Sequence, residues 1–193
     1  FEKADFSKII KYLKKTGVKK GDILIVHSAY EPLKTTGLKP KEIVDELLKL
    51  VGEKGTLVMP VIRKYKEAPK DPIKDSIDHI VFKYNSRKTR VWTGIIPLDL
   101  MRRKEAVISK TPINTIAAIG EESKIMFEKE LDEEIPTPNG KNSAWNYCLN
   151  RNAWNISIGI DLPHSLTMIH TVEDLKKENW PVKGWYRKKN FLI

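Results

Sequence analysis

The chain has 193 residues, of which 40% are hydrophobic, and this length suits one sizeable core better than two. Its net charge of +10 directs attention to anionic partners: a nucleic acid, an anionic membrane surface or a phosphorylated small ligand. No apolar run approaches the roughly 20 residues that span a bilayer, and the start of the chain lacks the layout of a signal peptide.

The first predicted element is an amphipathic helix. Phe6, Ile9, Ile10 and Leu13 recur at the spacing of one helical face, and Gly17 is a typical helix end. We therefore expect this helix to pack on the core through that face.

A strand, a helix and a second strand follow. Residues 23–26 and 56–59 are continuous apolar runs, typical of strands buried on both faces of a parallel sheet, and a helix between them begins at Pro40. Such a unit has a right-handed crossover, and ligands bind at the carboxyl ends of its strands. This places His27, Ser28 and the loop through Gly37 at the ligand edge.

The remaining elements complete a three-layer α/β/α domain with a central, largely parallel sheet, which we expect to span residues 1–193 as a single domain. Residues 63–90 form a charged insert or loop with little periodicity. The later elements predicted are helices at 95–103, 121–129 and 165–176, the last with Ser165 as N-cap, and strands at 115–119 and 156–160.

The last predicted helix carries the main catalytic candidate. Thr167, His170 and Glu173 are three residues apart and Asp174 is four beyond His170, so their side chains project near one helical face. A neutral imidazole is available near pH 7, and a carboxylate one turn away can fix its tautomer, which is what a general base requires. The alternative is an ordinary solvated pair on a helix surface.

Other common site types have no motif in the sequence. It contains no Gly-x-Ser-x-Gly elbow, Walker loop or Gly-x-Gly-x-x-Gly fingerprint, and its histidines and Cys148 lack zinc-ligand spacing, so we expect no metal. A lone cysteine fits a reducing compartment, which predicts a cytoplasmic location. The lysines are dispersed and no RNA-binding signature accompanies them, so nucleic acid is not the expected partner.

Several segments, read in order, resemble the aminoglycoside 3-N-acetyltransferase family. The last helix also carries the family's Thr-x-x-His-x-x-Glu pattern as Thr167, His170 and Glu173. Each segment is weak alone, but the ordered set covers most of the chain: 21–28, 53–60, 92–97, 115–120 and 137–143.

The resemblance implies an acyltransferase that uses acetyl-CoA and no metal, with His170 as general base and Glu173 orienting it. It implies that the amine attacks the thioester and that backbone donors near Thr115 stabilise the oxyanion. The cofactor-binding candidates are His27, Ser28, Ala29, Tyr30, Lys34, Thr36, Gly37 and Thr115, and the substrate-binding candidates are Asn114, Asp161 and Thr167.

This chain departs from the family at three positions. Thr111 and Asn114 replace two histidines of the family's His-Pro-x-His-Ser segment, and Leu98 stands where many members have a glutamate. Cationic aminoglycosides need acidic partners, so in this basic chain we expect an amino sugar that is nucleotide-linked or a polysaccharide precursor. The resemblance also implies that the family continues beyond the last helix.

Two other functions stay open. The chain could be a catalytically inactive module that binds coenzyme A or a sugar, which the replaced histidines favour, or a basic nucleic-acid-binding domain. The sequence leaves the oligomeric state open, including a homo-oligomer.

Overall fold

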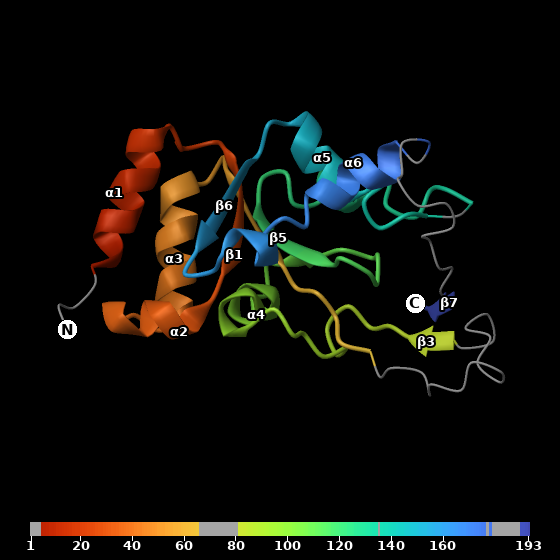
Figure 1. Ribbon diagram of the computed structural model, residues 1–193, viewed down its shortest axis with the longest axis horizontal. Helices are drawn as coiled ribbons and strands as arrows, with labels where there is room; N and C mark the ends of the chain where they lie inside the picture. Colours follow the sequence, from red (N-terminus) through yellow and green to blue (C-terminus); the bar gives the residue numbers. More distant parts are fainter. Residues whose placement is uncertain (1–4, 66–80, 135, 177, 179–189) are drawn as a thin grey trace.

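A mixed five-stranded sheet forms the centre of the molecule in the computed structural model, which describes residues 5–65, 81–134, 136–176, 178 and 190–193 (Figure 1). Its strand order is β4-β5-β2-β1-β6, and β1 is parallel to both β2 and β6. β5 is antiparallel to β2 and β4, so it alone runs against the other four. The strands are β1 (Ile23–Ser28), β2 (Thr56–Pro60), β4 (Val107–Ile108), β5 (Ile116–Gly120) and β6 (Trp154–Ile158).

The predicted strand-helix-strand unit is confirmed. β1 leads through α2 (Tyr30–Leu33) and the 3₁₀ turn η1 (Lys34–Thr36) into α3 (Pro40–Val51) and then β2. Every residue of β1 and β2 is buried, as a strand covered on both faces requires. α3 begins at Pro40, whose missing N–H costs nothing in the first turn, and its cap residue is Gly52.

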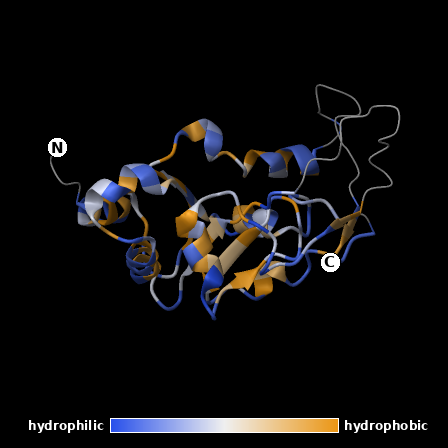
Figure 2. Ribbon diagram, turned by 90° about the horizontal axis from the view of Figure 1, so that it is seen from below, coloured by the Kyte–Doolittle hydropathy of each residue, from blue (hydrophilic) through white to orange (hydrophobic). Residues whose placement is uncertain are grey.

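One face of the sheet is covered by α1 (Phe6–Thr16), α3 and α4 (Ile95–Arg102). The Asp5 side chain caps α1 by accepting the Ser7 N–H, and Gly17 ends it in the left-handed conformation, as predicted. Leu24 and Val26 of β1 pack on this face against side chains of α1, α3 and α4. Figure 2 shows these helices alternating between hydrophobic and hydrophilic residues, as amphipathic helices do.

The other face is covered by the 3₁₀ turn η3 (Ile125–Phe127) and α5 (Ala144–Asn150). Ile23 and Ile25, which alternate with Leu24 and Val26 along β1, pack here against Trp145 and Cys148 of α5. Met168, the residue before α6 (Ile169–Leu175), packs against the same cluster.

A second, two-stranded parallel sheet joins β3 (Val81–Lys83) to β7 (Asn190–Leu192) at the end of the molecule away from α1 (Figure 1). The described ends of the predicted 63–90 insert are held by this sheet and by hydrogen bonds of Arg63. Arg63 is buried and donates to the carbonyls of Thr89 and Ser86 at 2.8 and 2.6 Å. Residues 66–80, including His79, lie outside the described residues.

Two predicted helices are wrong in part. Residues 121–129 form turns and η3 instead of a surface helix, and Met126 and Phe127 are buried, because this short segment closes over the sheet. The last helix begins at Ile169, not at Ser165. Ser165 follows the 3₁₀ turn η4 (Leu162–His164), and its hydroxyl is engaged with Ser157 and with the carbonyls of Asp161 and Leu162.

None of the helices in the described part of the chain is long and apolar enough to cross a bilayer.

Candidate active site

The carboxyl ends of three parallel strands meet at one edge of the sheet. β1 ends at Ser28, β2 at Pro60 and β6 at Ile158, and β5 begins opposite Pro60 because it runs the other way. The chain turns sharply at this edge: Gly159 has φ of 69°, and a Cβ there would lie 2.9 Å from the Ala29 carbonyl oxygen. The edge predicted from the sequence therefore forms.

The proposed cofactor loop, residues 29–37, is a pair of short helical turns rather than an open loop. Several of its side chains already have partners: the Tyr30 hydroxyl donates to the Leu38 carbonyl at 3.1 Å, and the Thr36 hydroxyl to the Leu33 carbonyl at 2.6 Å. Lys34 is exposed and pairs with Glu31 at 2.5 Å. Gly37 supplies the left-handed end of η1. These side chains shape the loop more than they offer free ligand groups.

Ser28 differs from those residues. It is 7% exposed, and its hydroxyl has no hydrogen-bond partner among the described residues. An unpaired buried hydroxyl costs free energy, so a group that needs a donor or an acceptor at the end of β1 would recover that cost.

His27 points to the opposite face of the sheet from Ser28, because side chains alternate along a strand. Its ring is buried and stacks against Trp145 with centroids 6.3 Å apart. Burial lowers the pKa of His27 to about 4, although a hydrogen bond with Asn155 opposes the shift. His27 is therefore neutral near pH 7, and its Nε2 has no partner among the described residues.

Asn114 and Thr115 lie just before β5. Asn114 has φ of 50°, in the left-handed region that asparagine tolerates, and its carbonyl accepts the Trp145 indole N–H at 2.7 Å. Its amide donates to Asn139 Oδ1 at 2.7 Å. Thr115 is fully buried, its hydroxyl donates to the Thr111 carbonyl at 2.9 Å, and its own carbonyl accepts the Val61 N–H at 2.8 Å.

The structure forms the predicted imidazole-carboxylate pair on α6. His170 Nδ1 lies 2.5 Å from Glu173 Oε2, and both side chains are about half exposed, at 51% and 44%. With the proton on Nδ1 facing the carboxylate, Nε2 is the ring nitrogen that can accept a proton. Thr167 is near this pair through its carbonyl, which accepts the His170 N–H at 3.2 Å.

Asp174 makes a hydrogen bond to a segment that is distant in sequence. Its Oδ2 accepts the backbone N–H of Asn139 at 3.0 Å, and Asn139 in turn bonds Asn114. Hydrogen bonds thus connect α6 to the start of β5 through Asp174, Asn139 and Asn114, and continue to Trp145. Among the described residues, no hydrogen bond joins His170 directly to His27, Ser28 or Thr115.

Among the described residues, Asp161 is not part of this network; it is exposed and bonded to the His164 ring. The structure therefore supplies a second exposed histidine-carboxylate pair close in sequence to the first. No hydrogen bond in the described part of the chain links Asp161 to Asn114 or Thr167.

Two residues that sequence reasoning missed support this site. Asn139 is 1% exposed and bonds both α6 and Asn114, and its place in segment 137–143 was the only available signal. Glu130 is 4% exposed and accepts the Ser109 hydroxyl and the Lys110 N–H, each at 2.7 Å. Burial raises the pKa of Glu130. Nothing in its sequence surroundings distinguishes it from the nearby surface glutamates.

The comparison with known families decides what this arrangement belongs to. The sequence profile of a family described as aminoglycoside 3-N-acetyltransferase matches residues 25–193. The chain belongs to this acetyltransferase family. The predicted resemblance is confirmed.

Several solved structures share the fold. Aminoglycoside acetyltransferase AAC(3)-Xa is 21% identical, with 89% of this chain and 61% of that chain covered and a TM-score of 0.69. The YokD protein from Bacillus subtilis is 22% identical, with 88% and 70% covered and a TM-score of 0.69. AAC-IIIb, whose structure is a binary complex with CoASH, is 18% identical, with 76% and 56% covered and a TM-score of 0.57.

The chain spans less than two thirds of the length of AAC(3)-Xa and of AAC-IIIb. A comparison with curated protein sequences finds no match. In the described residues, no group of three or more His, Cys, Asp or Glu side chains is arranged to hold a metal ion.

Proposed function

We propose that the chain carries an acetyl-CoA-dependent N-acetyltransferase activity whose acceptor is an amino group on a sugar. The observation that carries this proposal is the 2.5 Å pair of His170 and Glu173 on α6, in a chain of the aminoglycoside 3-N-acetyltransferase family. We treat residues 1–193 as one domain for this activity, with 63–90 as its insert.

His170 acts as the general base in this proposal. As the acceptor nitrogen forms its bond to the acetyl carbonyl carbon, it loses a proton, which Nε2 of the imidazole accepts. The carbon–sulfur bond of the thioester then breaks, and the coenzyme A thiolate leaves and is protonated from solvent. Glu173 holds Nδ1–H and stabilises the imidazolium that results. The half-exposed position of both side chains lets a substrate reach them and lets the proton leave to solvent.

Acetyl-CoA supplies an acetyl group activated as a thioester. The residues at the carboxyl edge suit such a ligand in one respect: the buried Ser28 hydroxyl lacks a partner in the described structure, at the end of β1. We propose that Ser28 and the backbone of residues 29–37 hold the cofactor, with His27, Tyr30 and Thr36 shaping the loop and Thr115 contributing its backbone. AAC-IIIb, which shares this fold, was solved with CoASH.

The net positive charge of the protein bears on which acceptor it binds. Repulsion by a net charge of +10 disfavours a polycationic aminoglycoside and favours an amino sugar that carries phosphate or carboxylate groups. We propose Asn114, Thr167 and Asp161 as residues that contact this acceptor. The cytoplasmic location and the oligomeric state stay predictions.

The pair on α6 can be tested with an internal control. We expect His170→Ala to lower turnover by roughly 10² to 10⁴ while acetyl-CoA still binds. His164→Ala is the matched control, because His164 is also exposed and paired with a carboxylate three residues away, in Asp161. Thiol release from acetyl-CoA in the presence of amino sugars is the assay. Equal activity of both variants would remove His170 from the mechanism.

The inactive module is the second candidate, and the Thr111 and Asn114 positions favour it. The Thr111 hydroxyl is buried without a partner in the described structure, and Asn114 is committed to hydrogen bonds with Trp145 and Asn139, so neither replaces a histidine as a proton acceptor. Calorimetric binding of acetyl-CoA without thiol release across an amino-sugar panel would favour the module over the enzyme.

A further inference from the structure

Two stretches of the chain are strongly basic: residues 8–20, which contain six lysines and no acidic residue, and residues 81–104. Residues 81–104 contain Asp99 as their single acidic residue against Lys83, Arg87, Lys88, Arg90, Arg102, Arg103 and Lys104. Arg103 is neutralised by Asp45 and Asp99. The exposed cations Lys83, Lys88, Arg90, Arg102 and Lys104 form no ion pair with a carboxylate among the described residues.

These cations belong to one surface because Arg87 joins their two segments. Its guanidinium donates to the carbonyls of Met101 and Ala106, each at 2.8 Å, and thereby fixes the 83–90 segment to the end of α4. Lys64 joins the group, since its N–H donates to the Arg90 carbonyl at 2.9 Å. We call Lys64, Lys83, Lys88, Arg90, Arg102 and Lys104 the basic ridge.

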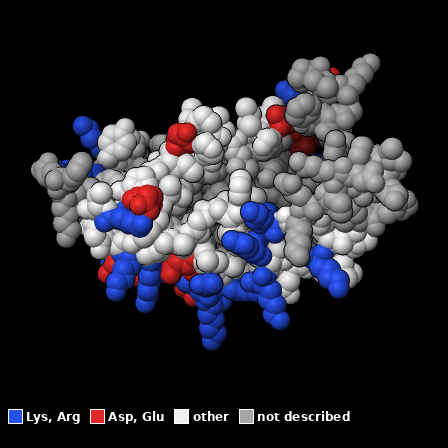
Figure 3. Space-filling view, turned by 60° about the horizontal axis from the view of Figure 1, so that its bottom comes forward, with Lys and Arg blue, Asp and Glu red and all other residues white. Residues whose placement is uncertain are grey.

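Figure 3 shows the face to which α4 belongs, with Lys and Arg side chains gathered along its lower part. Asp and Glu side chains are visible at the top and on the left, where some of them lie between the Lys and Arg side chains of the lower part. Clustered positive charge attracts anions over a distance of about 8 Å at physiological ionic strength.

The basic ridge continues into the candidate active site. Following Arg90, the exposed Trp92 leads to Thr93, whose hydroxyl donates to the Pro60 carbonyl at the end of β2 at 2.7 Å. A Cβ at the next residue, Gly94, would lie 4.0 Å from the Ser28 carbonyl oxygen. The segment 90–94 thus runs from the basic ridge to the carboxyl edge of the sheet, where we propose that acetyl-CoA binds.

We propose that the basic ridge docks a phosphate-bearing amino-sugar chain and presents its amine at the carboxyl edge of the sheet. This proposal rests on the proposed function and names its acceptor class. Each phosphate held by a lysine or arginine releases counterions, so the affinity depends on salt. Single-stranded nucleic acids bind through several stacked aromatic side chains, whereas the ridge segments expose only Trp92 in the described structure.

The test compares two triple variants. One reverses three charges on the basic ridge, and the matched control reverses three charges elsewhere on the surface. The ridge variant carries Lys88→Glu, Arg90→Glu and Lys104→Glu. The control carries Lys8→Glu, Lys11→Glu and Lys54→Glu, which are exposed and outside residues 81–104. Neither variant alters Arg87 or Arg103, whose hydrogen bonds hold the fold. Both therefore change the net charge equally while keeping the same core.

Kinetics with two acceptors test the ridge in the active enzyme. With a phosphate-bearing amino-sugar oligomer, we expect the ridge variant to raise KM roughly tenfold, and the wild-type KM to rise by a similar factor between about 50 and 200 mM salt. With a neutral amino-sugar monomer, KM and kcat stay unchanged, as does the KM for acetyl-CoA. The proposal is overturned if the ridge and control variants behave alike, or if the KM for the neutral acceptor rises equally.

A binding measurement separates failure of the ridge from failure of the proposed function. Linear inorganic polyphosphate, titrated into the protein and followed by calorimetry, needs no acetyl transfer. Binding that weakens only in the ridge variant supports the ridge even if no acceptor is acetylated. Absent or equal binding overturns it. Single-stranded DNA that binds more tightly than polyphosphate of equal charge would instead identify a nucleic-acid surface.

Discussion

The two faces of the central sheet are built differently. The face under α1, α3 and α4 is packed almost entirely with aliphatic side chains, such as Leu24 and Leu57 from the strands and Leu47 and Leu100 from the helices. The face under α5 mixes aliphatic side chains with buried polar ones, including His27, Asn139 and Glu130.

We infer from this difference that the aliphatic face stabilises the fold and that the polar face carries functional residues. A buried polar group is retained at a cost in stability unless all its hydrogen bonds are made. On the α5 face His27 Nε2, Thr111 Oγ1 and Asn139 Nδ2 have no partner among the described residues, and Ser28 Oγ and Arg63 Nε also lack one outside that face. Because α6, which carries His170, is hydrogen-bonded to this face through Asp174, the polar face is where we place the chemistry. The following predictions compare substitutions on the two faces.

The largest effect is expected where the polar face is held together. Trp145 is 1% exposed, stacks on His27 and donates to the Asn114 carbonyl. Trp145→Ala should therefore cost about 3–5 kcal/mol of unfolding free energy and should also lower turnover. Leu100→Ala, on the aliphatic face, should cost about 2–5 kcal/mol without a specific kinetic defect in the folded enzyme. Denaturant unfolding and kcat per folded molecule measure both. Equal kinetic losses would abolish the contrast.

The second-largest expected effect is a pH dependence of folding stability that His27, on the polar face, causes. The pKa of His27 falls from its usual 6.5 to about 4 on folding, so the unfolded state binds more protons between these values. Stability present above pH 6.5 is then lost as the pH falls toward 4, by about 3 kcal/mol in total.

The variant His27→Gln removes this titration and should flatten the acid side of the stability profile. Half-exposed His170 provides the control in His170→Gln. Urea unfolding of the three proteins between pH 4 and 7 gives the slopes, since carboxylates contribute equally to all of them. If the unfolding free energy of His27→Gln falls with decreasing pH as steeply as that of the wild type, groups other than His27 cause the loss of stability in acid.

The aliphatic face could be predicted from the sequence much better than the polar one. The periodicity of Phe6 and Leu13, the position of Pro40 and the buried strands are local signals, and the structure confirms each of them. The His170–Glu173 contact was also predictable, because a spacing of three residues on a helix fixes it.

The polar network was not predictable because its partners are distant in sequence. Asp174 and Asn139 are 35 residues apart, and Asn114 and Asn139 are 25 apart, so no periodicity connects them. Segment 121–129 shows the related failure: its apolar residues suit a helix, but Met126 and Phe127 are buried over the sheet in a 3₁₀ turn. The start of α6 shifted because Ser165 bonds Ser157 of β6 instead of capping a helix.

A smaller effect is expected from the link between α6 and β5. Asn139→Ala leaves the Asn114 amide without its acceptor in a half-buried site, which should cost about 1–3 kcal/mol. Asp174→Asn keeps an oxygen that can accept the Asn139 N–H, so its cost should be lower. Asn139→Ala keeps the backbone N–H that bonds Asp174, so it breaks the link only at Asn114. If the link positions His170, kcat falls in Asn139→Ala and stays near the wild-type value in Asp174→Asn, while the KM for acetyl-CoA stays constant. Wild-type kcat in both variants would show that the link serves stability alone.

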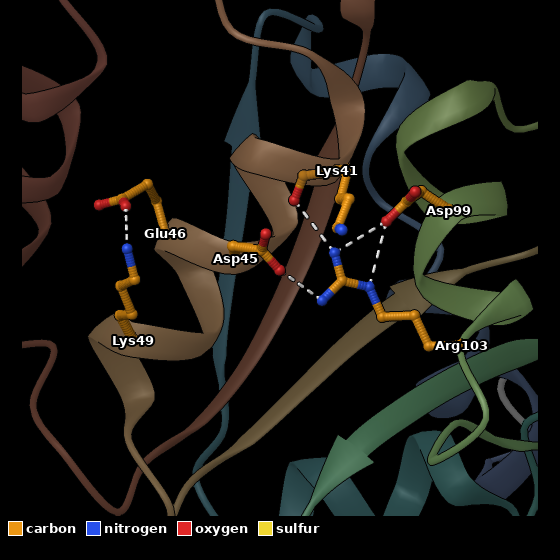
Figure 4. A network of polar contacts seen from close by, with 6 residues as sticks. All are labelled: Lys41, Asp45, Glu46, Lys49, Asp99 and Arg103. Carbon is orange, nitrogen blue, oxygen red and sulfur yellow. Dashed lines mark hydrogen bonds and ion pairs between the residues drawn. The ribbon is translucent and has the colours of Figure 1, made fainter.

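The smallest effect is expected from the ion pairs on the aliphatic side of the molecule. Arg103 joins α4 to α3 by bonding Asp45, Asp99 and the Lys41 carbonyl, whereas Lys49 pairs only with Glu46 on α3 (Figure 4). The Asp45 and Asp99 side chains are 38% and 28% exposed, so water can solvate them when Arg103 is removed. Arg103→Met should therefore cost only about 1–2 kcal/mol.

Lys49→Met is the control for Arg103→Met and should change stability by less than about 0.5 kcal/mol, because its pair is exposed to solvent. Thermal unfolding at low and high salt measures both variants, and salt should shrink the Arg103 effect only partly, since its side chain is 15% exposed. Neither substitution should alter turnover, because both lie away from the α5 face. A kinetic defect in Arg103→Met would mean that the scaffold face also sets the geometry of the site, and the two faces could no longer be assigned separate roles.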